Sequence, residues 1–80
     1  MVFQVLNRLK WTGRLGYAEV TFVHRGAPGD IKTISGKNIT EVRKGYMVYS
    51  NLEETVIPLH RIVEVRVSGE VVWRKRKGEE

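Results

Sequence analysis

The sequence predicts an α+β fold: one N-terminal amphipathic helix packed on a curled, barrel-like antiparallel sheet of about five to six short strands. Apolar residues near the N-terminus follow helical spacing, whereas later segments alternate or cluster in short runs of β-branched residues. Turn-forming residues separate these runs. A flat sheet of so many strands would leave long unpaired edges, so we expect the sheet to curl.

The helix is predicted over residues 2–11. Val2, Val5, Leu6 and Leu9 follow the i, i+3, i+4, i+7 spacing of one helix face, with polar residues between them. Gly13 suits the left-handed conformation that commonly ends a helix. This apolar face needs a partner, and the sheet is the obvious one.

Seven stretches carry strand character, separated by turn-forming residues. The stretches lie near residues 17–24, 31–35, 39–43, 46–50, 55–58, 62–67 and 71–76. The third is ambiguous between a strand and one helical turn, and its β-branched residues favour the strand. Pro58 marks a strand end or edge, because it lacks an amide hydrogen.

The composition indicates one small domain, residues 1–80. The absence of cysteine and the presence of only two histidines argue against disulfides and zinc sites, so we expect no metal and no cofactor. No apolar stretch approaches the roughly 20 residues that span a bilayer, and the N-terminus lacks a secretory-signal pattern. We therefore expect a cytoplasmic protein without a membrane partner.

The charge favours a polyanionic partner, and nucleic acid in particular. Fourteen Lys and Arg residues against nine Asp and Glu residues give a net charge of +5. Four cations in a row, Arg74, Lys75, Arg76 and Lys77, form a basic tail directly after Trp73. These cations would attract a phosphate backbone, and Trp73 or Tyr49 would stack a base of single-stranded RNA. Alternatively, the tail blocks edge pairing and Trp73 belongs to the core.

Both histidines are followed directly by arginine, as His24-Arg25 and His60-Arg61. An arginine fork matches phosphate oxygens, and histidine changes its charge near neutral pH. Strand alternation places His24 on the core side at a strand end, beside a Gly-rich loop that includes Gly26 and Asp30. If the fold brings the two pairs together, they form one anion pocket.

Two other interpretations of these pairs stay open. The histidines could bond internal carbonyl groups while Arg25 pairs with Asp30. Alternatively, His24 and His60 could serve as the acid and the base of a small phosphodiesterase or ribonuclease. The third residues of the two motifs, Gly26 and Ile62, do not fit the His-x-Thr or His-x-Ser repeat of two-histidine phosphodiesterases, so catalysis is the minority interpretation.

Several motifs carry a resemblance to a known family. They are Leu9-Lys10-Trp11, His24-Arg25-Gly26 with Asp30, Ile34-x-Gly36, Ile57-Pro58-x-His60-Arg61-Ile62 and Val72-Trp73-x-Lys75. From about Val5 to Lys75 the chain resembles the small archaeal proteins described as the RNA cyclic group end recognition domain. The resemblance implies a binding module for RNA ends that carry a 2′,3′-cyclic or related terminal phosphate. Its implied contact residues here are His24, Arg25, Asp30, His60 and Arg61.

Together these observations favour a non-catalytic module that binds a single-stranded RNA end. The family's larger relatives carry the domain beside RNA-processing domains, so an RNA-processing enzyme is a possible partner. A basic adaptor that docks a protein is the third interpretation. We expect the two His-Arg pairs and the Gly26–Asp30 loop to hold the terminal phosphate.

Overall fold

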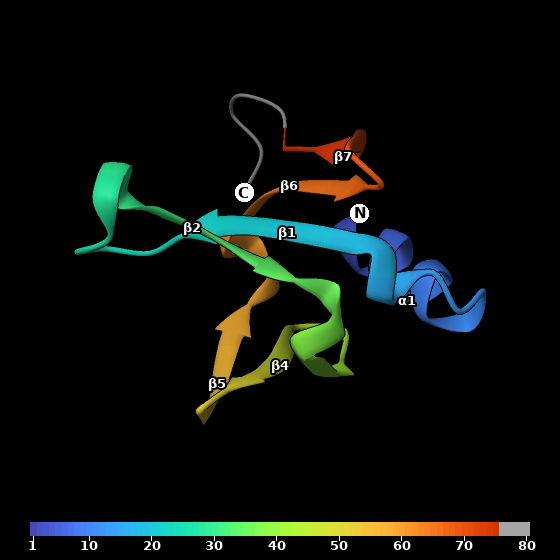
Figure 1. Cartoon of the computed structure of the whole chain (residues 1–80), viewed down its shortest axis with the longest axis horizontal. Coiled ribbons are helices and arrows are strands. Elements are labelled where there is room, and N and C mark those ends of the chain that lie inside the picture. The colour runs from blue at the N-terminus through green and yellow to red at the C-terminus, as the bar shows by residue number, and fades with distance from the viewer. Residues whose placement is uncertain (76–80) are drawn as a thin grey trace.

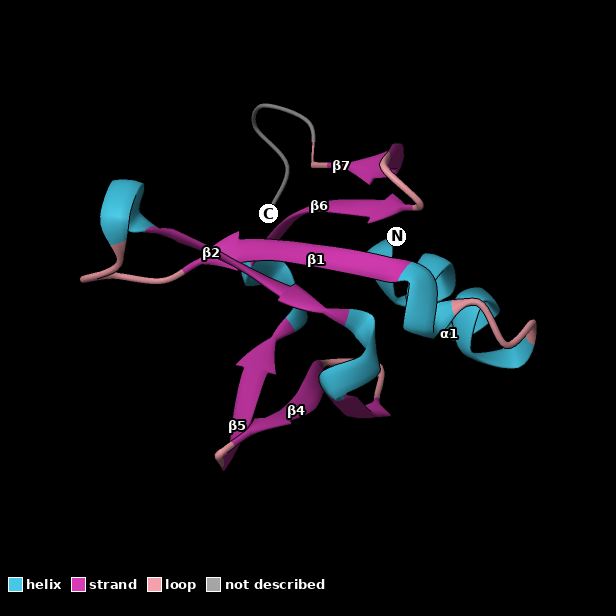
Figure 2. Ribbon diagram, in the orientation of Figure 1, coloured by secondary structure: helices cyan, strands magenta, loops and turns pink. Residues whose placement is uncertain are grey.

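The computed structural model describes residues 1–75, in which one α-helix precedes seven strands (Figures 1 and 2). The elements are α1 Val2–Trp11, β1 Ala18–Val23, β2 Ile31–Ser35, β3 Ile39–Val42, β4 Tyr46–Asn51, β5 Glu53–Pro58, β6 Ile62–Val67 and β7 Glu70–Arg74. Four short 3-10 turns lie between them: η1 Leu15–Tyr17, η2 Pro28–Asp30, η3 Gly36–Asn38 and η4 Leu59–Arg61. The predicted α+β class is confirmed.

Helix α1 depends on its packing. Its N-terminus has no side-chain cap and its first turn has no acidic residue, so local interactions stabilise that end little. Val2, Leu6 and Leu9 are instead buried in the core. The helix ends before Gly13, whose φ of 73° lies in the left-handed region.

The strands form two antiparallel sheets, so the predicted barrel-like sheet of five to six strands is wrong. One sheet has the order β2-β1-β6-β7, and the other has the order β3-β4-β5. Within residues 1–75, no strand of one sheet pairs with a strand of the other, so the barrel does not close. Figure 1 shows β4 and β5 running across the direction of β1, on one side of the four-stranded sheet.

Two 3-10 turns divide the sheets. η3 lies between β2 and β3, and η4 lies between β5 and β6, so each turn is a corner where the chain changes sheet. Pro58 enters η4 with a φ of −61°, the value to which its ring restricts it. Among the described residues, the middle strands therefore pair as the hairpins β3–β4 and β4–β5.

The core lies between the sheets and α1. It is built by alternate residues of the strands, of which Phe22, Val20, Met47, Ile62 and Val65 are fully buried. A bulge between β6 and β7 brings Trp73 opposite Val65, and Trp73 packs against the core from its edge. No helix in the described part of the chain has the length and apolar character needed to span a membrane.

Candidate functional site

The antiparallel pairing of β1 and β6 brings the two His-Arg segments to one end of the four-stranded sheet. β1 ends at Val23, directly before His24, and β6 begins at Ile62, directly after Arg61. Phe22 pairs with Ile62, so both segments leave the ladder where β1 ends and β6 begins (Figure 1). His24 and His60 are 36 positions apart in sequence. Both nevertheless lie just outside the same end of the β1–β6 ladder.

The loop after β1 is held by its own backbone. The His24 amide donates to the Asp30 carbonyl oxygen at 2.8 Å, and the Asp30 amide donates to the Ala27 carbonyl oxygen at 2.8 Å. Gly26 has a φ of 93° and Asp30 a φ of 58°. Glycine adopts a positive φ at no steric cost, and Asp tolerates it better than most residues, so these two residues shape the loop that presents Arg25.

The His24 ring lies at the edge of the core. Its centroid is 6.1 Å from that of Phe22, with the two rings nearly perpendicular. Phe22 is fully buried, so His24 lies on the core side of β1, as strand alternation predicts. His24 itself remains exposed, because it follows the last residue of the strand.

The second pair is presented by η4. Leu59 anchors this turn, because its side chain is buried and its amide donates to the Gly45 carbonyl oxygen at 3.1 Å. His60 and Arg61 follow as exposed residues. The His60 carbonyl oxygen accepts a 2.7 Å hydrogen bond from Lys75 Nζ, which ties β7 to this corner.

The polar side chains of both pairs are available to a ligand. Within residues 1–75, His24, Arg25, His60 and Arg61 make no side-chain hydrogen bond and no ion pair. All four residues are exposed. In the described part of the chain, the internal bonding considered from the sequence, including a pair between Arg25 and Asp30, is not formed.

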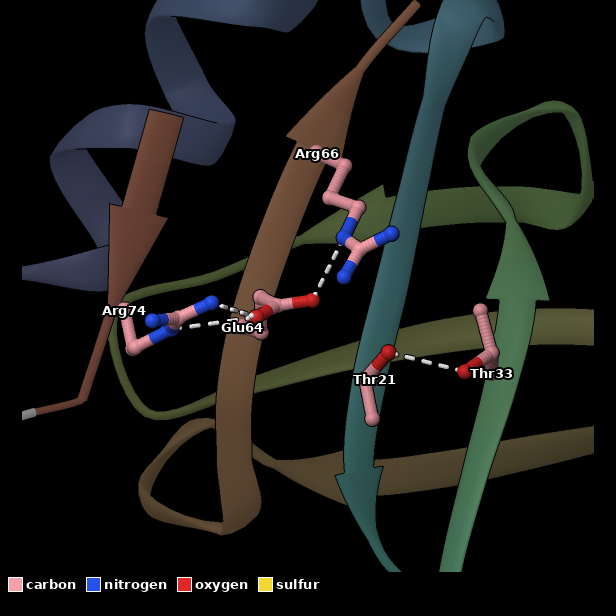
Figure 3. A network of polar contacts seen from close by, with 5 residues as sticks. All are labelled: Thr21, Thr33, Glu64, Arg66 and Arg74. Atoms are coloured by element: carbon pink, nitrogen blue, oxygen red, sulfur yellow. Dashed lines mark hydrogen bonds and ion pairs between the residues drawn. The ribbon is translucent and has the colours of Figure 1, made fainter. Parts of the chain in front are cut away.

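The two described residues of the basic tail, Arg74 and Lys75, both make hydrogen bonds within the chain. Arg74 donates to Glu64 through Nε at 3.1 Å and Nη2 at 2.8 Å, and Arg66 donates to the same carboxylate at 2.7 Å (Figure 3). The Arg74 hydrogen bond is the main cause of a lowered pKa of Glu64, and Arg66 adds to it. Arg74 is thus partly neutralised, whereas Lys75 reaches His60. Arg76 and Lys77 lie outside the described residues.

The two candidate stacking aromatics differ in access. Tyr49 is only 3% exposed, its ring packs on Phe22, and Lys32 Nζ lies 5.9 Å from its centroid. A base has no open face to stack on there. Trp73 is half-buried and lines a hollow of about 270 Å³ beside His60. Lys44 lines the same hollow and was not among the residues predicted from the sequence. The sequence feature that could have indicated it is the basic pair Arg43-Lys44 directly before Gly45.

Comparison with known proteins gives one consistent result. The model of the MJ1316 RNA cyclic group end recognition domain matches residues 1–75. A UPF0248 protein of Pyrobaculum islandicum is 43% identical over 79 residues, which cover 96% of this chain and 92% of the relative. The UPF0248 protein MJ1316 of Methanocaldococcus jannaschii is 35% identical over 80 residues, with 95% of each chain covered. No solved structure matches the chain significantly.

Proposed function

The chain belongs to the MJ1316 RNA cyclic group end recognition domain family, and on this premise we propose that it is an RNA-binding module that holds a terminal phosphate. In this proposal the preferred end is a 2′,3′-cyclic phosphate. The module binds the end without changing it.

One observation carries the proposal: the pairing of Phe22 with Ile62, which directs both His-Arg segments to one end of the β1–β6 ladder. Arginine donates charge-assisted hydrogen bonds to phosphate oxygens, and a histidine donates from both ring nitrogens when protonated. Arg25 and Arg61 are exposed and without an ion-pair partner in the described part of the chain, so no internal contact has to break before phosphate binds.

RNA oligonucleotides that differ only in their 3′ end test the proposal. We expect tighter binding of a cyclic-phosphate end than of a 3′-hydroxyl end in a fluorescence anisotropy titration. Arg25→Ala and Arg61→Ala should each reduce this preference about 10- to 100-fold, since a hydrogen bond to a charged group contributes about 1.5–3 kcal/mol. Arg8→Ala is the matched control, because Arg8 is an exposed arginine of α1. Equal affinity for both ends would contradict the proposal.

A second function is favoured by the same geometry. Two exposed histidines that leave one end of a ladder are the acid and base groups that a two-histidine phosphodiesterase needs. Incubating the cyclic-phosphate oligonucleotide with the protein separates the two functions. A binding module leaves the cyclic end intact, whereas an enzyme opens it to a phosphate monoester. The rate of this opening should have a bell-shaped dependence on pH, and His60→Ala should abolish the reaction.

A further inference from the structure

The hollow beside His60 is lined by four separate segments of the chain. Its volume is about 270 Å³, slightly below the range of about 300–1,000 Å³ typical of drug-sized ligands. It therefore suits one small group rather than an extended segment. The residues that decide its chemistry are Phe3 of α1, Lys44 before β4, Leu59 and His60 of η4, and Trp73 and Lys75 at the end of the chain's described part.

One side of the hollow is apolar. Leu59 is buried, and Phe3 and Trp73 are half-buried and pack against the core cluster. Trp73 is held by its pairing opposite Val65 in β6. A large aromatic ring on a strand can stack on a ligand. Because the strand already holds the ring in place, little entropy is lost in ordering it when the ligand binds.

The hollow also has a basic lining. Lys44 and Lys75 line it together with His60, and no acidic residue of the described chain does. Lys75 is fixed in place by its hydrogen bond to the His60 carbonyl oxygen. Lys44 is exposed and has no ion pair within residues 1–75. The hollow thus favours a group that combines a flat apolar face with a negative charge.

A nucleotide has this combination of properties. His60 lines the hollow and also belongs to one of the two His-Arg pairs, so a phosphate held by the pairs would carry its own nucleoside toward the hollow. Resting on the proposed function, we propose that the hollow receives the base of the terminal nucleotide, stacked on Trp73, with Lys44 and Lys75 beside the phosphate. The module would then recognise a terminal nucleotide as a whole.

Removing the base from the terminal nucleotide tests this inference. Two oligonucleotides with the same cyclic-phosphate end are compared, one with the terminal base and one abasic at that nucleotide. Because stacking one base on an aromatic side chain is a substantial contribution, we expect the abasic end to bind about 5- to 150-fold more weakly. Trp73→Leu should remove this difference, and Trp73→Phe should keep most of it.

A spectroscopic measurement covers the case in which Trp73→Leu fails to fold. Trp11 is 82% exposed, so Trp11→Phe leaves Trp73 as the one indole without disturbing the core. In this variant, the base-bearing oligonucleotide should quench Trp73 emission along its binding curve, and the abasic one should not. Quenching that is equal for both, or absent while both bind, would overturn the inference.

The outcomes for the two proposals are distinguishable. If cyclic ends are preferred over hydroxyl ends but the terminal base makes no difference, the hollow is not a base site and the proposed function stands. If base-bearing ends bind more tightly whatever their phosphate, the hollow binds bases and the end-recognition function is wrong. Loss of both preferences overturns both proposals.

Discussion

At Gly36, a single missing side chain decides how two parts of the chain pack. A Cβ atom built there would lie 1.9 Å from the Leu15 carbonyl oxygen and 3.2 Å from that of Ala18. Both neighbours are backbone atoms, which cannot move away as a side chain can. Gly36 therefore allows η3, the corner between the two sheets, to lie against the segment that leads into β1.

Gly36→Ala should destabilise the fold by about 1–3 kcal/mol or more, the usual cost of overpacking. Gly45→Ala is the matched control, because a Cβ atom there meets nothing within 4 Å. By restricting the unfolded chain it should be neutral or stabilising by up to about 1 kcal/mol. Urea unfolding followed by circular dichroism measures both changes, and equal midpoints for the two variants would contradict this account.

At the scale of single residues, the sequence predicts which side of a strand a site residue lies on, but not how accessible its side chain is. Alternation along β1 is a local rule, and it places His24 on the core side correctly. The accessibility of Tyr49 and Trp73 is not a local property. Tyr49 is covered by Phe22 from the other sheet, and Trp73 is turned toward the core by a bulge that no sequence period reveals.

At the scale of elements, α1 follows directly from its apolar spacing, but the division into two sheets does not follow from any period. Sequence patterns identify strands, whereas the pairing of strands depends on the corners between them. Here the corners are η3 and η4, turns of three residues each. Such short turns have no apolar period, so no sequence pattern indicates that the strands divide into two sheets rather than forming one.

The pairing of β6 with β7 carries a pH-dependent link. Glu64 of β6 accepts hydrogen bonds from Arg74 of β7 and from Arg66, and these contacts lower its pKa in the folded state. A carboxyl group with a lowered folded-state pKa stabilises the fold above its unfolded pKa. This contribution is lost as the pH falls through the lowered value.

Glu64→Gln should therefore be less stable than the native chain at pH 7, and the difference should shrink as the pH falls below about 4, the usual range for Glu. Urea midpoints measured between pH 7 and pH 2 test this expectation. Glu54→Gln is the control, because within residues 1–75 Glu54 forms no ion pair and its effect should stay small throughout. A Glu64→Gln effect that persists undiminished at pH 2 would exclude the electrostatic explanation.

At the scale of the whole molecule, the net charge of +5 predicts salt-dependent binding to RNA. The affinity should fall linearly on a plot of log K against log salt. Arg76→Ala should reduce the magnitude of this slope by about 0.7, the value for one lost contact with a single-stranded backbone, and leave the preference between RNA ends unchanged. Arg76→Lys keeps the charge, so its slope should match that of the native chain. A slope that Arg76→Ala does not change would show that this residue makes no backbone contact.

The pairing of Phe22 with Ile62 also determines when, during folding, the proposed RNA-end site forms. Hairpins such as β4–β5 and β6–β7 join neighbouring residues and close short loops, whereas β1 and β6 must meet across some 40 intervening positions. A half-folded chain could contain both hairpins and still hold its two imidazoles far apart. Under the proposed function, affinity for the RNA end would emerge only with the completed fold, and an incompletely folded chain would not compete for the same RNA.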